Sequence, residues 1–150
     1  MIDNNMMSII LPGRIVEYFP EDQTATVQVC AELITHSDSD KSTLTTREPI
    51  EGVPVVTPGG GGYHHTFPIK PDDTCILYFS QVGYDHWLYN NDNFAGALQN
   101  LPETWLNRQF DEDDGFALVG LNTLPLKISE YQTDRSEFRN ATRETRISIL

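Results

Sequence analysis

The sequence predicts an all-β protein, a small five-stranded barrel with long loops and a short C-terminal extension. Six Ala and ten Lys and Arg stand against ten Gly and nine Pro. This balance disfavours a helical bundle, because helix surfaces need Ala, Lys and Glu. Short runs of alternating polar and apolar residues lie between Gly- and Pro-marked turns, as is typical of strands. Apolar residues make up 39% of the chain, which allows a modest packed core.

The first predicted element is a β-hairpin over residues 14–33. Its first arm is apolar, residues 19–23 have turn chemistry, and residues 24–30 alternate between small or polar and apolar side chains. Ala25, Val27 and Val29 therefore share one face of a strand.

Residues 36–48 are polar and show no period, so they predict a loop. The apolar run 50–56 predicts a short or edge strand, because Pro54 cannot donate to a ladder. Residues 57–63 contain four consecutive glycines. They fit either a flexible loop tip or a backbone held close against another chain, where side chains would not fit. A phosphate loop is disfavoured because neither Lys nor a helix follows.

Residues 70–73 predict a type I turn with Pro71 at its first central position. Residues 74–80 form the most strand-like run, and their near-continuous apolar character predicts a strand covered on both faces. Trp87 and Leu88 are core candidates.

Residues 90–100 are rich in Asn and predict a loop, and residues 101–110 a short helical turn. An acidic turn over 111–115 precedes a final strand over 116–121.

The composition changes near Pro125. Residues 1–126 carry a net charge of −13, whereas residues 127–150 carry +1. We therefore divide the chain into a lead segment (1–12), a barrel domain (13–124) and a C-terminal extension (125–150). The spacing of Arg135, Arg139, Arg143 and Arg146 fits a helix, whereas Ile147, Ile149 and Leu150 fit a strand, and both interpretations stay open.

The formal charge of −12 disfavours binding to nucleic acids, because the chain would repel a phosphate backbone. Cys30 and Cys75 lie in apolar, strand-like runs and predict two buried free thiols, in keeping with synthesis in a reducing cytoplasm. The start of the chain has no basic segment followed by a long apolar one, so no signal peptide is expected. No apolar run is long enough for a membrane span.

The sequence predicts no catalytic, cofactor-binding or metal-binding residues. His64, His65, Asp85 and His86 are the best metal set, but adjacent histidines on a strand point to opposite faces. The run 111–114 only partly fits a calcium loop and predicts a solvated turn. Ser80 is not in a nucleophile elbow, and Cys75 has no neighbouring base. An enzyme is therefore not expected.

Several stretches, in this order, resemble the N-terminal domain of phage baseplate central spike proteins, the cell-puncturing proteins of contractile tails. The resemblance covers residues 11–124 and rests on Leu11-Pro12-Gly13-Arg14 and its continuation to Tyr18, and on 23–29, 52–61, 66–73, 85–88 and 114–121.

This resemblance implies an oligonucleotide/oligosaccharide-binding (OB) fold and a homotrimer on the tail axis, docked beneath a baseplate hub protein. It implies a virion protein made in the host cytoplasm, which contacts the host outer envelope transiently during contraction. A trimeric β-helix or β-prism usually follows in that family. Here the extension after Pro125 is short, so we expect either a very short spike or a separate spike-tip protein below.

Two alternatives belong to other classes. A carbohydrate-binding OB module would use Tyr63, Tyr84, Trp87 and Trp105 as a sugar-stacking face. A hydrolase of cell-wall glycan would need a pair of carboxylates, and the many acidic residues do not single one out.

Overall fold

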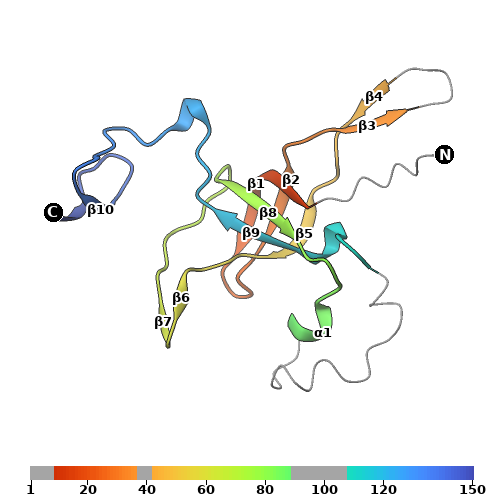
Figure 1. Cartoon of the computed structure of the whole chain (residues 1–150), viewed down its shortest axis with the longest axis horizontal. Helices are drawn as coiled ribbons and strands as arrows, with labels where there is room; N and C mark the ends of the chain where they lie inside the picture. The colour runs from red at the N-terminus through yellow and green to blue at the C-terminus, as the bar shows by residue number, and fades with distance from the viewer. Residues whose placement is uncertain (1–8, 37–41, 89–107) are drawn as a thin grey trace.

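The computed structural model describes residues 9–36, 42–88 and 108–150. A curled antiparallel sheet dominates it, with strand order β5-β2-β1-β8-β9 (Figure 1). Its strands are β1 (Ile10–Phe19), β2 (Thr24–Val29), β5 (Ile50–Pro54), β8 (Thr74–Phe79) and β9 (Gly115–Val119). The predicted all-β fold is confirmed: the curled sheet forms a half-barrel of the OB type.

Smaller elements surround the sheet. Three two-stranded ribbons pair β3 (Leu33–His36) with β4 (Ser42–Thr45), β6 (Gly59–Gly60) with β7 (Tyr63–His64), and β10 (Ser136–Arg139) with β11 (Arg146–Ile149). Single helical turns are α1 (Asp85–Leu88), η1 (Glu112–Asp114) and η2 (Leu124–Leu126). The extension therefore contains strands and no long helix, so of its two interpretations the strand is correct.

The curl brings the two edges of the sheet together. Val55, directly after β5, forms a parallel bridge with Ala117 of β9, and the Val56 amide donates to the Ala117 carbonyl at 2.9 Å. Pro54 lies at the end of the edge strand β5, as predicted. This contact satisfies backbone groups that an open edge would expose.

The core lies on the concave face. Alternate residues of β2 and β8 are buried there, as the period of two in residues 24–30 predicts for β2. The core residues are Ile15, Ala25, Val27, Val29, Ile50, Val53, Val55, Cys75, Leu77, Phe79 and Ala117.

At Gly13 the side chains of neighbouring strands pack directly against the backbone of β1. A Cβ atom there would stand 2.8 Å from Val27 Cγ1 and 3.1 Å from Cys75 Sγ. Two residues further on, the register of β1 with β2 shifts between Ile15 and Glu17. Such a bulge bends a strand, and together the two features let β1 curl over its neighbours.

Several predictions about the barrel were wrong. β8 is buried on one face only, since Tyr78 on the other face is 38% exposed. Trp87 is also exposed, and Tyr84 is buried instead. Cys30 ends outside the core and is exposed, whereas Cys75 is buried. Tyr78 lies on the second face of the half-barrel, which Tyr84 covers at Phe116 but which no second sheet covers within the described residues.

Two local predictions also change. The polar segment 36–48 is not all loop, because its start and its middle belong to the β3–β4 ribbon. The turn at 70–73 has φ of 74° at Asp72, which fits a type II turn and not type I. The Asp73 carboxylate accepts from the Lys70 amide at 2.8 Å and holds this turn. The predicted loop 90–100 and most of the helical turn 101–110 lie outside the described residues.

Gly13→Ala should destabilise the barrel by about 1–3 kcal/mol, because the added methyl group overpacks the core against Val27. Urea unfolding followed by tryptophan fluorescence would measure the change. The matched control is Gly60→Ala, since a Cβ atom at Gly60 has no neighbour within 4 Å and its φ is not positive. Equal unfolding midpoints for the two variants would contradict the steric role of Gly13.

Candidate functional site

The predicted metal set does not come together. His64 and His65 are exposed at the end of the β6–β7 ribbon. The His65 ring instead packs edge-on against Phe67 and Phe138, with centroid distances of 6.3 and 5.2 Å. In the described part of the chain, no three His, Cys, Asp or Glu side chains gather in a way that could hold a metal ion.

The acidic turn is not simply solvated. Asp114 is fully buried, and its Oδ1 accepts from Arg108 Nη2 at 2.9 Å and from the Tyr84 amide at 3.3 Å. Burial raises the pKa of the Asp114 carboxyl, which the Tyr84 amide and Arg108 only partly offset. Arg108 Nη2 also donates to Asp85 Oδ2 at 2.7 Å. The bound guanidinium makes this carboxylate a structural anchor and leaves it unsuited to a cation.

This anchor joins three segments. The Asp114 carbonyl accepts from the Ser80 amide at 2.8 Å, and the Tyr84 hydroxyl donates to the Gly115 carbonyl at 2.6 Å. The Tyr84 ring stacks on Phe116 with centroids 4.7 Å apart. The end of β8, the turn before α1 and the start of β9 are thus fixed to one another.

The sugar-stacking face is not assembled as expected. Tyr84 is buried against Phe116 and cannot stack on a ligand. Tyr63 and Trp87 are exposed, and Trp105 lies outside the described residues.

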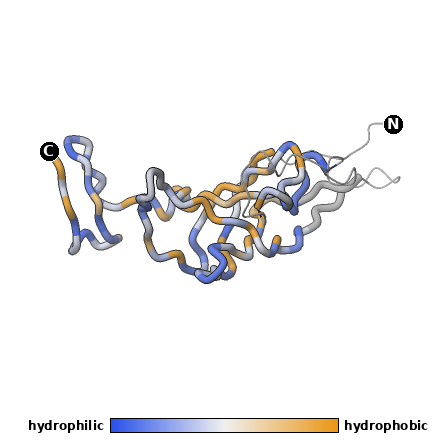
Figure 2. The backbone as a smooth tube through the Cα atoms, turned by 90° about the horizontal axis from the view of Figure 1, so that it is seen from below, coloured by the Kyte–Doolittle hydropathy of each residue, from blue (hydrophilic) through white to orange (hydrophobic). Residues whose placement is uncertain are grey.

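The β10–β11 hairpin is the clearest candidate site, because its apolar face points outward. The register pairs Phe138 with Ile147 and Ser136 with Ile149, so these residues share one face. Phe138, Ile147 and Ile149 are 52%, 69% and 60% exposed. In Figure 2 the hairpin lies at one end of the molecule and its last segment is hydrophobic, and its Phe138 ring contacts His65 after β7.

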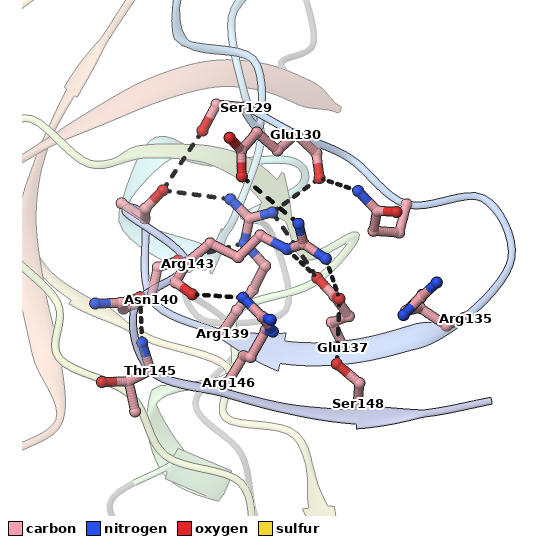
Figure 3. Close-up of polar contacts among 12 residues, drawn as sticks. Ser129, Glu130, Arg135, Glu137, Arg139, Asn140, Arg143, Thr145, Arg146 and Ser148 are labelled. Atoms are coloured by element: carbon pink, nitrogen blue, oxygen red, sulfur yellow. Dashed lines mark hydrogen bonds and ion pairs between the residues drawn. The ribbon is translucent and has the colours of Figure 1, made fainter.

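The opposite face of the hairpin is polar and is covered by its own chain (Figure 3). Glu137 accepts from Arg143 through both carboxylate oxygens, at 2.7 and 3.0 Å, and from Ser148 Oγ at 3.2 Å. Arg143 also pairs with Glu130 at 3.6 Å, and Arg139 Nη1 donates to the Glu130 carbonyl at 3.1 Å. The Arg143 hydrogen bonds hold the pKa of Glu137 below its ordinary value of 4.5.

The segment between barrel and hairpin is also apolar and exposed. Leu124, Leu126, Ile128 and Tyr131 all present large parts of their side chains to solvent. Like the outer face of the hairpin, these residues leave apolar surface unburied, which is typical of an interaction site.

The hairpin had a signal in the sequence that the arginine spacing obscured. Residues 146–149 alternate polar and apolar side chains, and a polar turn separates them from Phe138. Arg108 had no comparable signal, because its pairing with Asp114 depends on the path of the intervening chain.

A comparison with protein families decides the affiliation of the chain. The model of the phage protein Gp138 N-terminal domain matches residues 11–120.

The chain belongs to the phage protein Gp138 N-terminal domain family.

The Gp138 N-terminal domain match includes nearly all of the five-stranded sheet and ends before η2 and the β10–β11 hairpin. The expectation of a phage protein is thereby confirmed. No curated protein matches the sequence. Among the described residues, no helix has the length and apolar character needed to cross a membrane.

The two thiols of this Gp138-family chain should react differently. Burial raises the pKa of the Cys75 thiol to about 11, whereas Cys30 is exposed. A thiol-specific reagent should therefore label one cysteine per chain in the native protein and both in denaturant. Mass spectrometry would count the labels, and Cys30→Ser should leave no rapid native reaction. Rapid native labelling of that variant would show that Cys75 is not protected.

Acid should loosen the hairpin. The pKa of Glu137 is lower in the folded chain than in the unfolded one, so its stabilising effect is complete above pH 4.5 and disappears as the pH falls through the folded pKa. Hydrogen exchange of residues 136–149 should accelerate as the pH falls below 4.5, after correction for intrinsic rates. Glu137→Gln should exchange faster at pH 5 and lose the acid response, whereas Glu51→Gln, at an exposed position of β5, should behave like the parent chain. An unchanged acid response in Glu137→Gln would exclude this carboxylate.

Proposed function

We propose that the chain is a structural protein of a phage tail baseplate. It would be the homotrimeric central spike, or an adaptor between spike and hub, that docks beneath the tail hub and helps to pierce the host envelope. The family match to a phage protein domain supports this proposal, and so does the order of motifs along residues 11–124.

The outward apolar face of the β10–β11 hairpin is the observation that carries the proposal. A two-stranded hairpin is marginally stable by itself, and this one exposes Phe138, Ile147 and Ile149. Three copies around one axis would turn these faces inward and form a short three-sided β-prism. In a closed three-fold arrangement, the apolar face of each hairpin is buried against the other two hairpins.

The charge distribution fits such an assembly. The barrel part carries nearly all the negative charge, at −13 over residues 1–126, whereas residues 127–150 carry only +1. Apolar hairpins of nearly neutral charge can approach one another without strong repulsion, while the acidic barrels stay soluble and avoid DNA.

The partners follow from this placement. The acidic barrel would face a hub protein above, and the hairpins would face the envelope or a separate spike-tip protein below. In this role the chain transmits force along the axis and needs no reaction centre. The Asp114 carbonyl accepts a hydrogen bond from Ser80 after β8, and its carboxylate accepts one from Arg108. These bonds fix the start of β9 to the end of β8, which suits a part that must resist deformation.

The solution mass tests the proposal. The purified chain should have a mass of about 51 kDa, three times 17.0 kDa, by light scattering or sedimentation equilibrium. Ile147→Asp should shift the mass toward 17.0 kDa, because it places a charge in the centre of the prism. Val16→Asp, a change at an exposed valine of β1, is the control and should stay trimeric. A folded parent chain of 17.0 kDa would contradict the proposed function.

A further inference from the structure

We propose that the β6–β7 arm, residues 58–68, of one copy packs on the outer face of β1, β8 and β9 of a neighbouring copy. Three such contacts would close the barrels into a ring. This inference rests on the proposed function, which supplies the three copies, and it assigns a second interface besides the hairpins.

The outer face of the barrel has an ordered apolar surface. The register aligns Ile10, Tyr78 and Phe116 in one row across β1, β8 and β9. The next row contains Pro12, Ile76 and Leu118. These six side chains are exposed or half-buried, and none carries a charge. Phe116 is stacked against Tyr84 of its own chain, whereas Ile10, Pro12 and Tyr78 are exposed, so this part of the face resembles a core surface without its second layer.

The arm has the opposite shape and a matching chemistry. It projects from the sheet (Figure 1), and all its residues from 58 to 68 are exposed. Tyr63, near its tip, is 83% exposed. Residues 52–69 contain no Asp, Glu, Lys or Arg, although 21% of the chain is charged. An exposed segment of this length would ordinarily carry charges for solubility, and their absence favours burial in an assembly.

The glycines make the arm thin. Gly61 and Gly62 both have positive φ, at 61° and 83°, which is the geometry of a two-residue type I′ hairpin turn. Built Cβ atoms at Gly60, Gly61 and Gly62 meet nothing within 4 Å of their own chain. The bare backbone of β6 and of the turn lets Tyr63 approach another surface closely, which fits the interpretation of the glycines as a contact between chains.

The charge of the chain selects a second copy as the occupant. Copies that each carry −12 repel one another, so they can meet only where charges are absent. The arm and the outer face are two such surfaces, they differ in shape, and each chain carries both. A contact between unlike surfaces of identical chains closes into a ring when the rotation fits. A hub protein would need only one of these two surfaces, either the arm or the outer face, whereas a ring of identical chains uses both.

Cross-linking tests this contact. We would combine Tyr63→Cys and Tyr78→Cys with Cys30→Ser, which leaves the buried Cys75 as the only other thiol, and treat the protein with a short bismaleimide. The expected products are covalent dimers and trimers on a denaturing gel. The matched control replaces Tyr78→Cys by Val16→Cys, on a part of β1 that does not pair with β8, and should give uncross-linked chains.

A second measurement does not depend on the reagent. Tyr63→Ser should raise the concentration at which the trimer dissociates by about tenfold or more, because a buried tyrosine is often an interface hot spot. Its circular dichroism spectrum should stay unchanged, since Tyr63 is exposed within its own chain.

The outcomes separate this inference from the proposed function. A trimeric parent chain that gives no cross-link between the introduced thiols, and no weaker trimer with Tyr63→Ser, would overturn the arm contact and leave the spike proposal standing. Cross-linking within single chains would also overturn it. A monomeric parent chain would overturn both.

Discussion

The close contact of β2 with the bare backbone at Gly13 is the constraint on which the barrel depends. Since no side chain separates the strands there, Val27 and Cys75 meet over Gly13, and β1 curls far enough for Val55 to reach Ala117. The core is correspondingly thin, with small residues such as Ala25 at its centre. One curled sheet can bury only its concave face, so the apolar residues on its convex face stay half-exposed.

The sequence predicted well where structure depends on neighbouring residues. The alternation through Val27 and the edge position of Pro54 are local properties, and both agree with the fold. The burial of Asp114 was missed because it depends on Arg108 and on the path of the chain between them. Trp87 was misplaced for a related reason: hydrophobicity indicates that a residue prefers burial but not whether a single chain can provide it.

The barrel and the β10–β11 hairpin are stabilised by different interactions. In the barrel, the buried carboxylate of Asp114 lies beside the apolar core and is anchored by the half-buried Arg108. In the hairpin the apolar side chains are on the outside instead. Glu137 and Arg143 pair on the face turned toward the chain, while Ile147 points to solvent. The paired side chains are largely shielded, since Glu137 is 6% and Arg143 17% exposed. The hairpin thus obtains its shape from local pairing and leaves its apolar surface for association.

The distribution of charge links these features to assembly. Hydrophobic association of like-charged copies requires that the contact surfaces exclude the charges that keep the free chain soluble. The sequence is segregated in this way: its charge-free segment 52–69 contains the arm, and the hairpin pairs charges on one face. Hairpins alone would join three chains at one end only. In the proposed trimer, a second contact at the level of the barrels would fix their orientation as well.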